Sequence, residues 1–176
     1  RWAKERGIEV TAEATPHHLL LTEELVRTYD PVFKVNPPLR READVMALRE
    51  GLADGTIDTV GTDHAPHTAE TKECEWTVAA MGMTGLETAL PVVQHALVDT
   101  GLMDWAGVSR ILSSTPARIA RLTDQGRISA SGVFETGAPA NVTVYDPHVT
   151  RTVDPATHAT RSRNSPYRGM ELPGQV

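Results

Sequence analysis

The sequence contains few of the residues on which several classes of protein depend. Its 176 residues include one cysteine, Cys74, so no disulfide can form within the chain, and this composition fits a reducing compartment. Aromatic residues make up 5% and the net charge is −6, which argues against nucleic-acid binding, because that requires a basic and stacking surface. No apolar run approaches about eighteen residues, and no signal peptide is recognisable. We therefore expect a cytoplasmic globular protein that binds neither nucleic acid nor membranes.

The start of the chain is unusual for a complete protein. There is no initiator Met, and residues 1–6 have the pattern of the end of a helix. Gly7 suits the left-handed residue that follows a helix, and residues 8–14 then alternate like a strand. We expect the chain to be a piece of a longer protein that opens inside an αβ unit.

Strand and helix patterns alternate through the first 122 residues, which predicts parallel βα units. Helices are expected at 22–27, 41–54, 85–99, 105–112 and 115–122, and strands at 8–14, 32–35 and 57–62. The composition then changes near Thr123. Short strands are expected at 141–145 and 149–153 around a turn at Asp146 and Pro147, followed by an irregular tail at 162–176. We place a boundary between residues 1–122 and a β-rich segment, residues 123–176.

The strand expected at 57–62 leads directly into Asp63-His64-Ala65-Pro66-His67. A carboxylate at the C-terminal end of a buried strand, followed by a histidine-bearing loop, is where barrel enzymes place their chemistry. An aspartate can bind a divalent metal or move a proton. The alternative is that Asp63 caps the next turn and the histidines are solvated, because this spacing alone sets no geometry.

Three other segments are candidates for the same site. Glu13 ends the first strand, shortly before the adjacent His17 and His18, which cannot share one metal if they lie on opposite faces of a strand. For these histidines, the alternative is that one packs under the next loop and the other is solvated. Asn36 precedes two prolines that stiffen its loop. Residues 81–85 contain glycines that allow close approach of the backbone to a ligand. The alternative is that these glycines only form turns in a loop.

The order of these segments closely resembles the C-terminal part of class I dihydroorotases, which are metal-dependent amidohydrolases. The resemblance is carried by E-A-T-P-H-H-L from Glu13, N-P-P-L-R from Asn36, T-D-H-A-P-H from Thr62 and G-M-T-G-L-E-T from Gly82. It extends through S-T-P-A-R at 114–118 and G-A-P-A-N-V-T-V-Y-D at 137–146. It implies an α/β fold: the C-terminal part of a TIM-type (β/α)8 barrel over residues 1–122, then part of a small β-sandwich in residues 123–176.

The resemblance also implies roles for individual residues. Asp63 resembles the aspartate that binds the catalytic zinc and takes the proton of the attacking water. His67 resembles the histidine that meets the substrate carboxylate, and Asn36 the asparagine at the substrate ring. Met81 and Gly82 lie where the family offers backbone groups to the substrate.

The remaining metal ligands of the family come from earlier strands, and no segment here matches them. Glu13 matches a glutamate that contacts an additional metal in some relatives, whereas His17 does not match a ligand. Zn²⁺ is therefore the implied cofactor, and the fragment alone is expected to be inactive and to bind zinc poorly.

The implied activity is the reversible ring opening of dihydroorotate to carbamoyl aspartate in pyrimidine biosynthesis. The binding partner is then a small-molecule substrate. Assembly into a homo-oligomer, or with another enzyme of the pyrimidine pathway, is left open. Two alternatives remain: another cyclic amidase, such as an allantoinase or hydantoinase, and a metal-free homologue with a structural or assembly role.

Overall fold

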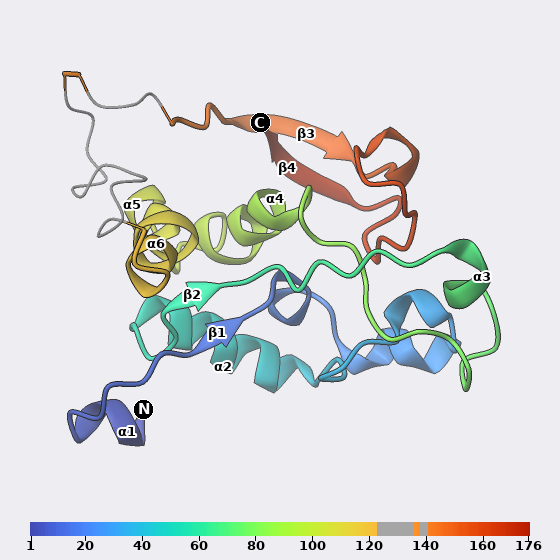
Figure 1. Cartoon of the computed structure of the whole chain (residues 1–176), viewed down its shortest axis with the longest axis horizontal. Helices are drawn as coiled ribbons and strands as arrows, with labels where there is room; N and C mark the ends of the chain where they lie inside the picture. The colour runs from blue at the N-terminus through green and yellow to red at the C-terminus, as the bar shows by residue number, and fades with distance from the viewer. Residues whose placement is uncertain (123–135, 138–140) are drawn as a thin grey trace.

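The computed structural model describes residues 1–122, 136–137 and 141–176, and it is a mixed α/β structure (Figure 1). At its centre, β1 (Glu13–Ala14) pairs in parallel with β2 (Thr59–Val60). The register places Glu13 opposite Thr59 and Ala14 opposite Val60. Because the two strands run in the same direction, the loops that follow them leave from the same edge of the sheet.

The connection between these strands contains α2 (Glu42–Ala53), close to the helix expected at 41–54. The Asp44 carboxylate accepts a hydrogen bond from the backbone N–H of Arg41 at 3.3 Å, which caps the first turn. Gly55 follows the helix with φ +80, the left-handed conformation that ends many helices. Leu52 is fully buried and packs with Val60 in the core against the sheet.

The helices that follow β2 pack with α2 into one core beside the sheet. α4 (Ala89–Val93) continues into the π-type turn η4 (Gln94–Val98), and α5 (Trp105–Ser109) continues through η5 (Arg110–Ser114) into α6 (Thr115–Ile119). The α4 region is apolar because it is buried on two sides. Val93 joins the core at the sheet, whereas Val92 joins a second core with Met83, Tyr167 and Leu172.

The C-terminal hairpin packs on α4 (Figure 1). It consists of β3 (Asp146–Thr152) and β4 (Glu171–Gln175), which are antiparallel with an irregular register between Asp146 and Thr150. Gln94 attaches it to the helix. Its amide donates to the Pro147 carbonyl at 2.9 Å, and its oxygen is 2.6 Å from the Tyr145 hydroxyl.

Several short elements complete the described chain. They are α1 (Trp2–Glu5), η1 (Pro16–Leu19), η2 (Glu23–Thr28), η3 (Pro31–Phe33), α3 (Ala69–Lys72) and η6 (Pro155–Thr157). None of the helices in the described ranges is long and apolar enough to cross a membrane.

The structure corrects four expectations about local elements. The strand expected at 32–35 is replaced by η3, because the Asp30 carboxylate accepts from the Val32 N–H at 2.9 Å and starts a turn at Pro31. Residues 141–145 do not pair as a strand, and the turn expected at Asp146 and Pro147 lies inside β3. The tail is not irregular throughout, since residues 171–175 pair with β3. In the last two cases, pairing between distant segments outweighs the local preference of proline and aspartate for turns.

Candidate functional site

Asp63 lies in the loop that follows β2, at the edge where the loop after β1 also begins. Its backbone has φ +46, in the left-handed region that non-glycine residues seldom adopt. Its side chain is exposed, and no hydrogen bond or ion pair of it is found within the described part of the chain. Strained backbone conformations of this kind cluster at functional sites. The structure therefore presents the carboxylate at the loop edge without neutralising it.

Glu13 points into the same region. Its carboxylate lies against Gly61, so closely that a Cβ on that glycine would overlap it. Gly61 is two residues before Asp63, and its N–H donates to the Ala14 carbonyl at 3.0 Å. The absence of a side chain at position 61 thus leaves the space that the Glu13 carboxylate fills.

His67 lies next to Met81 and Gly82. The family resemblance implied a substrate-binding role for all three residues. His67 Nε2 is 2.9 Å from the Met81 carbonyl oxygen. Because a carbonyl can only accept, Nε2 carries the hydrogen, and Nδ1 is the ring nitrogen left for another partner. Nδ1 can meet a carboxylate only when it also carries a proton, so an anion would bind His67 as imidazolium.

The backbone at 81–82 is already engaged within the chain. The N–H of Gly82 donates to the Lys34 carbonyl at 2.9 Å. Gly82 has φ +127, and a Cβ there would lie 2.6 Å from the Ala65 Cβ and 3.0 Å from His67 Nε2. Glycine is required at this position by both its conformation and its contact with the 63–67 loop.

Two lysines hold the loop that leads to Met81. Lys34 Nζ donates to the carbonyls of Trp76 and Ala79, each at 2.7 Å, and to a third carbonyl at 3.2 Å. Lys72 Nζ donates to the carbonyls of Lys34 and Ala80 at 3.0 and 2.9 Å. Burial, and then the nearby Lys34 charge, lower the pKa of Lys72 to about 8. Sequence reasoning assigned neither lysine a role, because their partners are backbone atoms that leave no pattern in the sequence.

Asn36 comes two residues after Lys34, whose carbonyl accepts from the Gly82 N–H. It is exposed, and it precedes a cis peptide bond to Pro37. The Pro37 carbonyl accepts from His18 Nε2 at 3.0 Å, while His18 Nδ1 is 2.7 Å from the Thr15 hydroxyl. The loop of Asn36 is thereby tied to the loop after β1. Within the described residues, no hydrogen bond joins Asn36 to Asp63 or His67.

Both histidines after β1 are buried, which corrects the expectation that one of them is solvated. His17 is 1% exposed and His18 is 8% exposed. Burial, followed by the charge of His18, lowers the pKa of His17 to about 3, so the His17 ring is neutral. Its Nε2 is buried without a hydrogen-bond partner among the described residues.

The tail brings further residues to the 63–67 loop that the sequence did not indicate. Ser162 and Asn164 make hydrogen bonds to the backbone of His67, Ala65 and Gly82. His64 Nδ1 accepts from two backbone N–H groups, at Gly85 and the next residue, both at 3.2 Å. These contacts join three segments that are far apart in the sequence.

The described residues do not by themselves form a complete metal site. No group of three or more His, Cys, Asp or Glu side chains in the described ranges is placed to hold a metal ion. A zinc site with three or four protein ligands therefore does not fit these residues alone. Asp63 can contribute one carboxylate, and no chemical step through a metal can be derived from this chain.

Curated proteins similar to this chain over its whole length are dihydroorotases. No family model matches. The chain is 66% identical to the dihydroorotase of Streptomyces coelicolor, covering all of this chain and 40% of that protein. It is 60% identical to the dihydroorotase of Leifsonia xyli and 52% identical to that of Mycobacterium tuberculosis, again over the whole chain and 39% and 40% of those proteins. The chain thus spans about two fifths of the length of these relatives.

Solved structures show a related arrangement. The L-hydantoinase (dihydropyrimidinase) of Arthrobacter aurescens superposes with a TM-score of 0.87 at 29% identity. It covers 98% of this chain and 38% of that enzyme. The dihydropyrimidinase of Brevibacillus agri superposes with a TM-score of 0.84 at 26% identity, over 99% of this chain and 38% of the other. The similarity to both enzymes is again confined to about two fifths of their length.

Proposed function

The chain belongs to the dihydroorotase family, and on that premise we propose that the whole protein catalyses the reversible hydrolysis of dihydroorotate to N-carbamoyl-aspartate. The observation that supports this most is the contact of His67 with Met81 and Gly82, on the loop that begins at the exposed and conformationally strained Asp63. We further propose that residues 1–122 form the C-terminal part of a (β/α)8 barrel and that residues 123–176 form part of a β-sandwich, although 123–135 and 138–140, with the expected boundary at Thr123, lie outside the described residues.

In this proposal Asp63 accepts the proton of the attacking water and returns it to the leaving nitrogen. The Asp63 carboxylate suits this exchange because it lies in the loop after β2 and forms no ion pair with a neighbour in the described chain. His67, as imidazolium, holds the substrate carboxylate through Nδ1 while Nε2 stays on the Met81 carbonyl. Asn36, Met81 and Gly82 orient the ring.

The metal belongs to the same proposal. Zinc fits the family, and Asp63 would supply one of its ligands, with the others coming from parts of the whole protein that this chain does not contain. A cytoplasmic location is also proposed, because the relatives are metabolic enzymes and the single cysteine fits a reducing compartment.

The proposal is tested with the whole protein by measuring turnover of dihydroorotate, allantoin and hydantoin. We expect turnover of dihydroorotate only. Turnover of allantoin or hydantoin instead would favour the rival cyclic amidase. No turnover of any substrate, together with the absence of bound zinc, would favour the metal-free homologue with a structural or assembly role.

Two substitutions then test the residue roles. Asp63→Ala should abolish turnover. His67→Ala should retain the metal and raise KM roughly 10- to 150-fold, as expected from the loss of about 1.5–3 kcal/mol for one charge-assisted contact. His148→Ala, an exposed histidine of β3, is the matched control and should change neither. If His67→Ala removed the metal while Asp63→Ala stayed active, the two roles would be reversed.

A further inference from the structure

We propose that Ser162 and Asn164 are positioning residues of the active site. They hold the 63–67 loop and the backbone at 81–82 in the geometry that binds substrate. This inference rests on the proposed function, because it acts through the roles given there to His67 and Gly82. It assigns a role to the tail after residue 158, a segment that lies about 95 residues along the chain from the loop that it holds.

Ser162 binds both backbone groups of His67. Its hydroxyl lies 2.6 Å from the His67 carbonyl oxygen, and the His67 N–H donates to the same hydroxyl at 3.1 Å. A hydroxyl has one hydrogen and two lone pairs, so it can donate to one oxygen and accept from the N–H at once. The Ser162 hydroxyl also lies in close contact with the Asn164 side-chain oxygen, which places the two tail residues in one network.

Asn164 joins the two loops to each other. Its Nδ2 donates to the Ala65 carbonyl at 2.9 Å and to the Gly82 carbonyl at 3.3 Å, while its Oδ1 accepts from the His67 N–H at 3.3 Å. Its own carbonyl accepts from the N–H of Thr84 at 3.1 Å. One amide side chain thus uses both donor hydrogens and its acceptor on the backbone that flanks the site.

The chemistry of this position favours asparagine. Asn164 is 6% exposed, so a lost hydrogen bond would not be replaced readily by water. Aspartate has the same shape but no donor, and its carboxylate would face the carbonyl oxygens of Ala65 and Gly82. The resulting repulsion would push the two loops apart.

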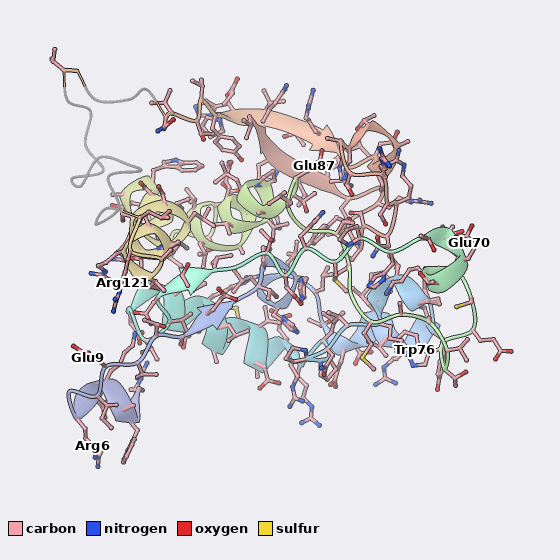
Figure 2. All side chains as sticks on the ribbon, viewed as in Figure 1. Arg6, Glu9, Glu70, Trp76, Glu87 and Arg121 are labelled. Atoms are coloured by element: carbon pink, nitrogen blue, oxygen red, sulfur yellow. The ribbon has the colours of Figure 1, made fainter. Side chains whose placement is uncertain are left out.

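The tail is itself anchored on both sides of these residues. Before them, the Glu87 carboxylate accepts from the N–H groups of Ala159 and Thr160 at 2.9 and 3.1 Å. Figure 2 shows Glu87 beneath the hairpin, at the side where the tail returns. After them, Tyr167 is fully buried in the second core together with Met83. A tail fixed at both ends can impose its geometry on the loops.

A small displacement of the loops would reach the substrate-binding groups directly. The His67 ring is bonded to Met81, and Gly82 leaves no space for a Cβ between itself, Ala65 and His67. Because the contact is this close, a shift of the 63–67 loop must move the His67 ring relative to the 81–82 backbone. Substrate affinity should fall while the chemical step is largely retained.

The test uses two pairs of variants, and one variant compared with wild type, in the whole protein. Asn164→Asp is compared with Asn141→Asp, an exposed asparagine that serves as the matched control. Ser162→Ala is compared with Ser162→Thr, which restores the hydroxyl. Asn164→Ala is compared with wild type. We measure KM and kcat for dihydroorotate, the metal content, and amide hydrogen exchange in peptides that cover 64–68 and 81–84.

We expect Asn164→Asp and Ser162→Ala to raise KM about tenfold or more with kcat changed much less, because they disturb binding and not the reacting groups. Exchange in both peptides should be about tenfold faster, whereas exchange in α2 and the metal content should be unchanged. Ser162→Thr should recover KM, and Asn141→Asp should match wild type.

Two results would overturn the proposal. One is faster exchange or lower thermal stability with KM unchanged, since that is a structural role only. The other is exchange and KM equal to those of Asn141→Asp. If Asn164→Asp does not fold, the comparison of Ser162→Ala with Ser162→Thr decides whether the proposal holds.

Failure of the proposed function is distinguishable from failure of this inference. If wild type hydrolyses hydantoin and not dihydroorotate, the proposed function fails, and KM of the variants is measured for hydantoin against the same expectation.

Discussion

Gly82→Ala is the substitution for which the structure gives the most defined expectation. At φ +127 an alanine is strained, which costs on the order of 1–3 kcal/mol. Its Cβ would also lie 2.6 Å from the Ala65 Cβ and 3.0 Å from His67 Nε2. Overpacking of this kind costs about 1–3 kcal/mol, so the free energy of unfolding should fall by roughly 2–6 kcal/mol.

Gly101→Ala separates strain from crowding. Gly101 has φ +75, and a Cβ there would meet no other atom within 4 Å. It should therefore cost only the left-handed conformation, about 1–2 kcal/mol. Urea unfolding of both variants in the whole protein measures their free energies of unfolding. We expect Gly82→Ala to lose about 1 kcal/mol or more beyond the loss in Gly101→Ala. Gly82→Ala should also raise KM for dihydroorotate, because the His67 ring must move. Equal destabilisation of the two variants, with KM unchanged, would refute the reasoning.

Two further predictions concern buried groups that lack partners in the described residues. Since the pKa of His17 is lowered from 6.5 to about 3, the unfolded chain binds a proton below pH 6.5 that the folded chain does not, and stability should fall as pH drops from 6.5 towards 3, by up to about 1.4 kcal/mol per pH unit. His17→Phe should weaken the dependence of the urea unfolding midpoint on pH between pH 7 and pH 5, whereas His148→Phe should leave that dependence unchanged. The same pH dependence in His17→Phe as in wild type would contradict the inference that His17 is buried as the neutral ring. Tyr167→Phe removes a buried hydroxyl without a partner, whose pKa is raised far above its ordinary value by burial, so the melting temperature should stay the same or rise. A clear loss of thermal stability would show that the hydroxyl is satisfied in the whole protein.

Local features were predictable because they depend on residues close together in the sequence. The helix at Glu42–Ala53 follows from its apolar spacing, and the glycine after it adopts the left-handed conformation. The positive φ of Gly7 agrees with the predicted end of the first helix. The position of Asp63 directly after a strand was also expected, and β2 ends three residues before it.

Strand lengths were less predictable. The alternation at residues 8–14 suggests a long strand, yet within the described part of the chain only Glu13 and Ala14 of this segment pair. Pro147 belongs to an expected turn and Pro173 to a tail expected to be irregular, yet the two prolines lie in β3 and β4. A strand exists only where a neighbour supplies hydrogen bonds, and that neighbour can be far along the chain.

The candidate site shows the same division. The sequence by itself determined which residues could carry chemistry, because Asp63, His67 and the glycine at 82 belong to compact local motifs. Only the tertiary structure decided that the His67 ring lies on the Met81 carbonyl, and that Ser162 and Asn164 bind the same loop from about 95 residues away. The physical reason is that these bonds are made to backbone groups. Every residue carries such groups, so only the folded chain determines which of them meet.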